Sequence, residues 1–337
     1  MEKILSVCIP SYNMEKYLRR NFDSFLVPEC LDALELIVVN DGSKDGTLEI
    51  ANEYKAKYPN TVVVIDKPNG HYGSCVNAAL KIATGKYFRI VDADDWVDSA
   101  ALSVVIQSMS LIDADMVYTQ YSTYHETDGS THVEEDVAIM PWGMTVNLND
   151  VKFDKYLHMH QVSYRLDLLK HIDYHQTEGV CYTDTEYDFI PCIHAKTIHP
   201  IQISFYQYFV GRNDQSMAPA VIARNFMHLY KVLESIIDYP KPENANSNYD
   251  FLRNRYIDTL FGYLVDAIFT SRASNLEWNQ LLRDMIDKLK SQGYDLSKYW
   301  NRTFWGCHWI KALYKNDSLS RMMLKFMFAA LKFRLAL

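Results

Sequence analysis

The amino-acid sequence predicts an α/β protein built on a mostly parallel sheet that helices cover. Two observations support this class. Over residues 1–120, apolar runs rich in β-branched residues alternate with segments in which apolar residues recur at helical spacing. The runs are apolar on both faces, as in parallel strands covered on both sides. With 337 residues, 48% of them hydrophobic, the chain can bury a sizeable core and is expected to be globular.

The first half of the chain has regular alternation. Strands are predicted at 4–9, 34–39, 61–65 and 86–91, and a helix is predicted after each of the first three. In an open parallel sheet, ligands bind beyond the carboxyl ends of the strands. Polar or turn-forming residues occupy those ends, at 10–13, 40–43, 66–73 and 92–95. These four segments are therefore the candidate binding site.

The pattern changes after Ala114. Longer alternating strands, with a turn at Asp128-Gly129, continue to Met217 and predict a second half of the same domain. Apolar stripes at 223–237, 250–269 and 276–290 then predict helices, with a polar linker at 238–248. The expected domains are 1–217, with halves 1–120 and 121–217, and a helical region 218–337.

The fourth predicted strand ends in three carboxylates, Asp92, Asp94 and Asp95. Like charges this close repel each other and lose hydration, so a bound cation is the expected reason for collecting them. Capping of a helix at 98–112 would explain one or two of the acids. A calcium loop of the EF-hand type is excluded, because Val97 and Ser103 stand where Gly and Glu are needed.

Two other chemistries fit the acidic segment less well than a metal site. An aspartyl nucleophile of a phosphohydrolase also follows an apolar strand, but here Trp96 occupies the fifth position of the motif and the strand is the fourth. Nicotinamide binding would need a G-x-G-x-x-G segment after the first strand, and none is there. We therefore expect Mg²⁺ or Mn²⁺, held by Asp94 with Asp92 alongside, facing a diphosphate.

Four segments in register carry a family resemblance: LSVCIPSYNMEKYL, IVVNDGSKDGT, NGHYGSCVNAAL and YFRIVDADDW. Together they resemble the nucleotide-binding half of an inverting family 2 glycosyltransferase with the GT-A fold. Segments 159–170, 180–189 and 205–217 extend the likeness, which is to a bacterial subgroup that makes surface or capsular polysaccharide. The resemblance covers about two-thirds of the chain.

The resemblance implies a nucleotide-sugar donor, most simply a UDP-sugar, and assigns residues to it. Tyr12 would stack on the base beside Pro10 and Asn13, and Asp41 would accept hydrogen bonds from the uracil or ribose. Asp66 would lie at the rim. The remaining donor-binding positions are Asn77, Asp92, Ala93 and Arg212. A stacked tyrosine can also be structural, and an Asp in an N-D-G-S turn can serve the turn alone.

One departure from the family concerns charge. Many relatives have Arg before the Asn of the third motif, where this chain has Val76. The phosphate charge would then be met by the metal, by Arg212 or by Lys16. The Gly73-Ser74 turn at a helix start could add backbone N–H groups.

Inverting transfer also needs a base for the acceptor hydroxyl. The resemblance implies Asp184, in a Thr-Asp pair where the family has Glu-Asp, with Glu186 and Asp188 nearby. Asp184 could instead only cap its helix. His160 is the candidate for the acceptor side, although a lone His is more often structural.

The expected function is metal-dependent, inverting transfer of a sugar to a lipid-linked or oligosaccharide acceptor in cell-surface polysaccharide synthesis. A non-catalytic module that binds nucleotide sugars or glycans is the first alternative, and a phosphohydrolase is the second. Donor hydrolysis in the presence of metal would separate the first two. No nucleic-acid partner is expected.

The last segment has an unusual charge. Residues 301–337 contain seven Lys or Arg and one Asp, a net charge of +6. Because the whole chain has a net charge of −8, the other residues have a net charge of −14. Segment 317–337 predicts a basic amphipathic helix that lies on a membrane surface, or a helix packed on the core. Scattered cysteines and an N-terminus without an apolar signal region favour the cytoplasm, at the inner face of the plasma membrane.

Overall fold

The computed structural model describes residues 2–211, 219–270 and 276–296. Contacts divide the chain into two compact units. The first is Met1–Asn213 with Tyr239–Tyr256, and the second is Asp214–Asp238 with Ile257–Leu337. Arg212 and the basic segment 317–337 lie outside the described residues.

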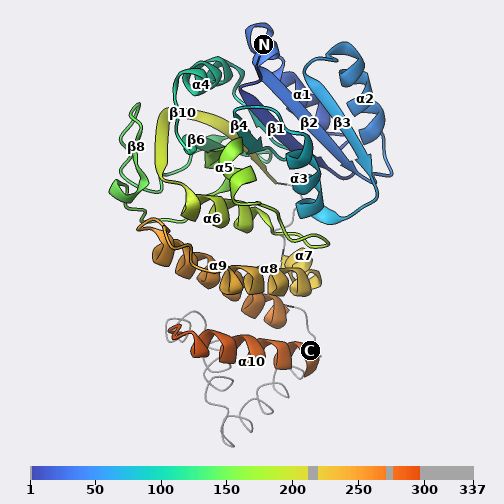
Figure 1. Ribbon diagram of the computed structural model, residues 1–337. Helices are drawn as coiled ribbons and strands as arrows, with labels where there is room; N and C mark the ends of the chain where they lie inside the picture. The colour runs from blue at the N-terminus through green and yellow to red at the C-terminus, as the bar shows by residue number, and fades with distance from the viewer. Residues whose placement is uncertain (1, 212–218, 271–275, 297–337) are drawn as a thin grey trace, which may run out of the picture. The chain divides into compact units, whose positions relative to one another are not determined.

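The first unit is built on one mixed sheet (Figure 1). Four parallel strands, β3-β2-β1-β4 in spatial order, form one side of it. Their bounds are β1 Leu5–Ser11, β2 Leu34–Asp41, β3 Val62–Lys67 and β4 Tyr87–Ile90. All eight residues of β2 are buried, as expected for a strand covered on both faces.

The other side of the sheet continues as β4-β9-β6-β10-β5. Strand β9 (Val162–Arg165) is antiparallel to both β4 and β6 (Met116–His125). The long β10 (Thr197–Val210) is parallel to β6 and antiparallel to the short β5 (Trp96–Val97). Strands β7 (Thr131–Val133) and β8 (Val146–Asn147) pair off this path. Because β5 directly follows the acidic segment, β10 returns to the candidate site.

Six α-helices of this unit flank the sheet. They are α1 Leu18–Phe25, α2 Thr47–Lys57, α3 His71–Ile82, α4 Ser99–Leu111, α5 Leu166–His171 and α6 Asp184–His194. Short 3-10 segments lie at Pro28–Ala33, Leu148–Asp150 and Met159–Gln161. Asp98 caps α4 by accepting a 2.9 Å bond from the Ala101 amide. Capping therefore accounts for this acid and leaves the three before it.

The predicted polar linker 238–248 is wrong as a solvated connection, because its residues from Tyr239 onward pack in the first unit. Asn246 and Asn248 are buried. Asn246 donates 2.7 Å to the Cys192 carbonyl, and Asn248 donates 2.8 Å to the Val151 carbonyl. Their amides satisfy buried backbone groups, a role that polar composition conceals.

The helical region predicted after residue 218 is present. Its helices are α7 Pro219–Arg224, α8 Phe226–Asp238, α9 Tyr249–Thr270 and α10 Leu276–Ser291. The stripe expected as one helix at 223–237 is divided near Asn225. Lys288 of α10 pairs with Glu234 at 3.2 Å and Asp238 at 2.5 Å. Among the described helices, none combines the length and the apolar character needed to cross a bilayer.

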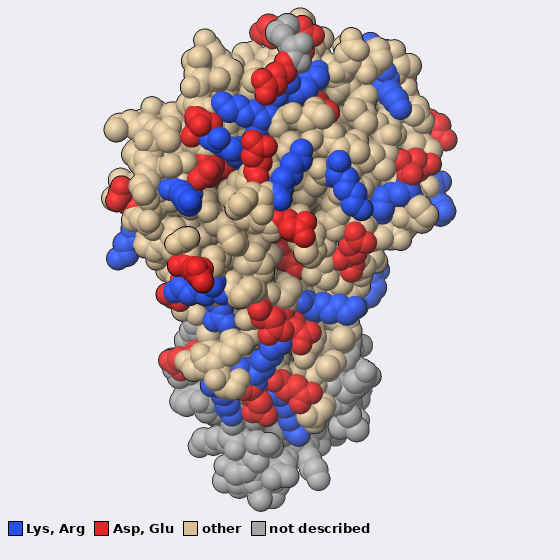
Figure 2. Space-filling model, in the orientation of Figure 1, with Lys and Arg blue, Asp and Glu red and all other residues tan. Residues whose placement is uncertain are grey.

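Charges of both signs are mixed on the face shown in Figure 2. The Lys and Arg side chains of the described residues alternate there with Asp and Glu, and they do not gather into one basic field.

Candidate active site

The loop after β1 is tied to the loop after β2. Asn13 adopts a left-handed backbone conformation, with φ 56°. Its amide donates 3.0 Å to Ser43 Oγ, and its side-chain oxygen accepts 2.8 Å from the Lys44 amide. Asn tolerates this conformation better than most residues, and its short side chain bonds locally. Asn13 therefore holds two of the four predicted segments together.

Pro10 and Tyr12 flank this connection. Tyr12 is 46% exposed, so its ring is open to a ligand, whereas Pro10 is half-buried. Lys16, one of the cations proposed for the phosphate, is exposed, and Val76 is fully buried.

Asp41 ends β2 next to the last residue of β3. It is 3% exposed and forms an ion pair with Lys67. The same oxygen, Oδ1, accepts 2.9 Å from the Gly70 amide. Asp66 is exposed and accepts 2.7 Å from the Asn40 side chain. The carboxylate of Asp41 is therefore firmly oriented, while Asp66 stands at the edge.

The acidic segment after β4 folds back on itself. One carboxylate oxygen from each of Asp92, Asp94 and Asp95 lies within 4.8 Å of the others. Asn21 of α1 donates to the carbonyls of Asp92 at 3.0 Å and Asp95 at 2.9 Å. These bonds fix the tight backbone that brings three like charges together.

Asp95 is committed to the fold. One of its oxygens accepts from the Tyr206 hydroxyl and the other accepts 2.7 Å from the Phe209 amide. Burial, followed by the charges of Asp94 and Asp92, raises the pKa of Asp95 well above its usual range. Because Asp95 fastens β10, the pair left for a cation is Asp92 and Asp94.

Arg20 supports the same segment from α1. It donates 2.6 Å to the Asp94 carbonyl, and its guanidinium lies 4.0 Å from the Trp96 ring centroid and 4.5 Å from that of Phe209. Burial lowers the pKa of Arg20, while the charges of Asp95 and Asp94 act in the opposite direction. The sequence analysis did not identify Arg20. The available signal was its position in an amphipathic helix just after the first motif.

The loop before α6 lies on the start of α3. Asn77 donates to the Gln176 carbonyl at 3.0 Å and to Glu178 at 2.9 Å, and it accepts 2.8 Å from the Gln176 amide. A Cβ on Gly73 would meet the Thr177 carbonyl oxygen at 2.3 Å. The Asn77 side chain was predicted to bind the donor, but in this structure it holds the loop before α6. Gly73 is required where this loop packs on α3, because a larger residue would collide with Thr177.

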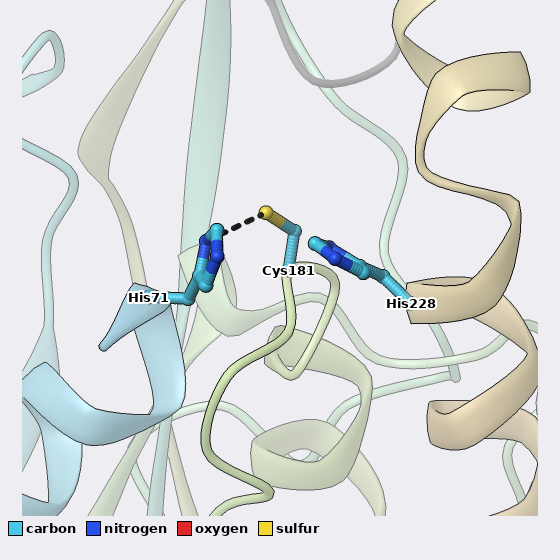
Figure 3. A group of neighbouring side chains, drawn as sticks. All are labelled: His71, Cys181 and His228. Carbon is cyan, nitrogen blue, oxygen red and sulfur yellow. Dashed lines mark hydrogen bonds between the residues drawn. The ribbon is translucent and has the colours of Figure 1, made fainter. Parts of the chain in front are cut away.

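The same loop touches α3 again through a thiol and an imidazole. Figure 3 shows the Cys181 side chain beside His71, with 3.8 Å between Sγ and Nδ1. His71, at the start of α3, has φ 63°, and Tyr182, just before α6, has φ 70°. With Asn13, three non-glycine residues of this site are in the left-handed region, which indicates a backbone that surrounding contacts enforce.

Asp184 follows this loop as the first residue of α6. It is partly exposed, and burial raises its pKa above the usual range. Glu186 is not equivalent to it, because Glu186 is buried and accepts from the Thr177 amide at 2.8 Å and from the Thr177 hydroxyl at 2.7 Å. Asp188 is also buried, and its Oδ1 has no partner among the described residues.

Two tyrosines link the acidic segment with Asp184. Tyr72 of α3 donates 2.7 Å to Asp92 Oδ1, and burial, then the charges of Asp92 and Asp184, raise its pKa. The pKa of Tyr208 is raised by burial and then by Asp95, Asp92, Asp94 and Asp184. The charges of the acidic segment and of Asp184 therefore both act on Tyr72 and Tyr208, which indicates that the two groups of carboxylates are neighbours.

His160 belongs to an aromatic cluster that includes Tyr208. Its ring lies 4.5 Å from Tyr206, 4.6 Å from Tyr208 and 5.0 Å from Tyr121, measured between centroids. Burial, then His158, lowers the pKa of His160 well below its usual range, so the ring is neutral at pH 7. Its Nδ1 is buried without a partner among the described residues.

Arg89 lies beneath the cluster, fully buried. It donates to the His160 carbonyl, to Ser163 at 3.2 Å and to Thr119 at 3.3 Å, and burial lowers its pKa to about 10. A single Arg inside an apolar strand was the available signal for this residue.

Comparison with known proteins identifies the family. Residues 6–173 match the family model described as Glycosyl transferase family 2. The chain belongs, through this domain, to glycosyltransferase family 2. A curated relative, the poly(ribitol-phosphate) beta-glucosyltransferase of Bacillus spizizenii, is 41% identical over 109 residues, which are 29% of this chain and 16% of that protein. The matched stretch spans less than two-fifths of the first curated relatives' length.

Solved structures show the same fold over nearly the whole chain. S. aureus TarS 1-349, in complex with UDP-GlcNAc, matches with TM-score 0.61 and 19% identity, covering 99% of this chain and 92% of the 1-349 chain. A mannosyltransferase from Pyrobaculum calidifontis, in complex with GDP-Man and Mn²⁺, matches with TM-score 0.52 and 15% identity, covering 98% and 85%. The expected GT-A fold with a helical C-terminal region is confirmed.

Proposed function

We propose that this family 2 protein is an inverting, metal-dependent glycosyltransferase that uses a UDP-sugar. The observation that carries the proposal is that Tyr72, which donates 2.7 Å to Asp92, is also close enough to Asp184 for both charges to raise its pKa, so the acidic segment and Asp184 are neighbours. A donor and an acceptor have to meet between such groups, because inversion is a single displacement at the anomeric carbon.

The donor half would hold the nucleotide at the strand ends. The exposed Tyr12 ring offers a stacking surface, and the oriented Asp41 offers a fixed hydrogen-bond acceptor. UDP-GlcNAc in the TarS complex supports a uridine nucleotide, since the two chains share the fold. The sugar itself would lie toward Asp92 and Asp94.

Asp92 and Asp94 fit a hard divalent cation. Carboxylates are preferred ligands of Mg²⁺ and Mn²⁺, and two of them with substrate oxygens make a typical set. Asp95 is excluded from this set, because both of its oxygens accept bonds from β10. A bound Mg²⁺ or Mn²⁺ would supply positive charge to the diphosphate leaving group. The Mn²⁺ in the Pyrobaculum enzyme supports this assignment.

Asp184 would act as the base. It would accept the proton of the acceptor hydroxyl while the oxygen forms a bond to the anomeric carbon and the bond to the diphosphate breaks. Its raised pKa makes it a stronger base than an exposed Asp, which suits proton abstraction near neutral pH. Glu186 cannot replace Asp184 as the base, because its carboxylate oxygens accept hydrogen bonds from Thr177.

The acceptor is proposed to be a lipid-linked or oligosaccharide glycan in cell-surface polysaccharide synthesis. His160, a partly exposed residue, would line the acceptor side. The poly(ribitol-phosphate) beta-glucosyltransferase relative supports a surface polymer. On sequence alone, the basic segment 317–337 is proposed to rest on the cytoplasmic face of the membrane.

The test is a screen of the purified chain for thermal stabilisation by nucleoside diphosphate sugars with and without Mn²⁺. One UDP-sugar should raise Tm only with metal and then release UDP when the matching acceptor is added. Stabilisation by a sugar nucleotide without turnover with any acceptor or water would support a binding module instead. Phosphate release without any sugar acceptor would support a phosphohydrolase.

A further inference from the structure

Lys67 has a set of contacts that the catalytic proposal does not use. It is the last residue of β3 and stands opposite Asp41 in the register of β2 and β3. Its ammonium forms the ion pair with Asp41 and donates 2.7 Å to Ser74 Oγ and 3.0 Å to the Pro68 carbonyl. An ammonium has three N–H donors, so all of them are used.

The structure makes room for this arrangement. A Cβ on Gly70 would lie 2.6 Å from Ser74 Oγ and 3.2 Å from Lys67 Nζ. Glycine at this position therefore allows the ammonium, the Ser74 hydroxyl and the Gly70 amide to converge on one point. Only 20% of the Lys67 side chain is exposed, so the ion pair is largely shielded from water and salt.

The consequence for Asp41 is an asymmetric carboxylate. Both Lys67 and the Gly70 amide donate to Oδ1. The Cys75 thiol is a further hydrogen-bond partner of the Asp41 side chain, and its pKa is raised to about 12 by burial and then by the Asp41 charge, so it stays protonated. Lys67 and Gly70 thus hold Oδ1, and with it the orientation of a carboxylate that can only accept hydrogen bonds from a ligand.

We propose that Lys67 is a specificity-determining and positioning residue, which holds Asp41 as a fixed acceptor and so selects a base with an imino N–H, uracil, over cytosine. The proposal rests on the function proposed above, in which Asp41 contacts the base. A carboxylate in an ion pair can only accept hydrogen bonds. Uracil offers N3–H to it, whereas cytosine offers a lone pair at N3.

A mismatch at such a site is costly. When a buried polar group is built to meet a donor, an analogue without the donor leaves that group unpaired and is strongly rejected. If Lys67 did not hold Oδ1, the carboxylate could rotate about its bond to Cβ and meet another donor, such as the exocyclic amine of cytosine. Discrimination depends on orientation, and Lys67 supplies it.

A competing role is direct contact with the diphosphate, since Val76 leaves no Arg for that charge. Comparing nucleosides with nucleotides separates the two roles. In the presence of Mn²⁺, we would measure binding of UDP and CDP by calorimetry and binding of uridine by competition. The proteins are the unaltered chain, Lys67→Met, and Lys81→Met as control. Lys81 is an exposed lysine of α3, and its change removes the same charge.

Lys67→Met should weaken UDP and uridine by the same factor, about tenfold, and the preference for UDP over CDP should shrink by a similar factor. Lys81→Met should change neither. In Asp41→Asn the Lys67 change should add little, because the two residues act as one unit. If Lys67→Met does not fold, Lys67→Gln has the same expectations.

Two results would overturn the inference. Loss confined to UDP, with uridine unchanged, would place the ammonium on the diphosphate. An unchanged preference for UDP over CDP would show that Asp41 needs no partner. Failure of the unaltered chain to bind any nucleoside diphosphate with metal would contradict the proposed function itself, which is a separate outcome.

Discussion

The Tyr72 hydroxyl donates a 2.7 Å hydrogen bond to Oδ1 of Asp92, across 20 residues of sequence. Burial and the neighbouring Asp92 and Asp184 charges raise the pKa of Tyr72, so the hydroxyl remains a donor at neutral pH. A proposed cation ligand is therefore oriented by a residue that α3 supplies. Outer partners of this kind commonly tune metal affinity.

Tyr72→Phe should weaken metal-dependent UDP binding by about tenfold, since it removes one hydrogen bond to a charged group. The change should appear as a higher Mn²⁺ concentration for half-maximal binding in a titration followed by calorimetry. Tyr58→Phe, at the end of α2, is the matched control and should bind as the unaltered chain does. Equal Mn²⁺ requirements in all three proteins would mean that Asp92 needs no help from Tyr72.

Asp94 and Asp95 should behave oppositely when each is changed to Asn. Asp94→Asn should abolish the metal-dependent part of UDP binding, as EDTA should, with little change in Tm. Asp95→Asn should lower the free energy of unfolding by about 1–3 kcal/mol, because its carboxylate holds Tyr206 and the Phe209 amide. Circular dichroism melts and UDP titrations with and without EDTA distinguish the two effects. If UDP affinity is the same with EDTA and in Asp94→Asn as in the unaltered chain with metal, Asp94 does not hold a metal that the donor needs.

The local pattern predicted much of this site. Apolar strands that end in polar residues placed Asn13, Asp41 and the acids after β4 at one edge of the sheet, because parallel strands share that edge. The start of α6 at Asp184 was also predicted from its motif. These features depend on short stretches of sequence, in which periodicity and turn residues are informative.

Long-range partners could not be predicted in the same way. Tyr206 and Asp95 are 111 residues apart, and Asn77 meets the Glu178 loop across 101 residues. Asn248, in a segment with the composition of a linker, is buried against Val151. Each pairing depends on the register of strands or on loop packing. The identity of one polar residue in the sequence does not indicate which distant residue it contacts.

Asp184→Asn should lower turnover by about 10²–10⁴-fold while donor affinity stays nearly unchanged. The rate needs the ionised carboxylate. Because burial raises the Asp184 pKa, activity should be lost on acidification at a higher pH than an ordinary Asp would give. A kcat/KM profile from pH 4 to 8, with UDP affinity at each pH, measures both.

Glu186→Gln is the matched control for Asp184, and it should alter loop stability more than the rate. A large loss of turnover in Glu186→Gln with an active Asp184→Asn would show that the base has been assigned to the wrong carboxylate.

The full chain should sediment with vesicles that contain anionic lipid, whereas a chain ending at Asn316 should not. Basic residues near an anionic surface contribute about 1 kcal/mol each, in addition to burial of the apolar side chains of 317–337. The difference should shrink as salt rises, because screening weakens the attraction. Equal sedimentation of both chains, or of neither at low salt, would assign the segment a role within the protein.

Asp188 should make stability fall as pH rises. It is buried, its Oδ1 has no partner among the described residues, and burial with the nearby Asp184 charge raises its pKa well above the usual range. Between the unfolded value, about 3.9, and the higher folded value, the folded chain keeps a proton that the unfolded chain releases. Stability from this group is therefore complete below about pH 4 and declines by about 1.4 kcal/mol per pH unit above it.

Asp188→Asn removes this titration with almost no change in shape. The variant should match the unaltered chain near pH 4 and melt at a higher temperature at pH 7, as measured by calorimetry at both values. Asp167→Asn, on an exposed position of α5, controls for the loss of one charge and should leave the pH dependence intact. A Tm difference between Asp188→Asn and the unaltered chain that is constant from pH 4 to 7 would mean that Asp188 ionises in the folded chain as easily as in the unfolded one.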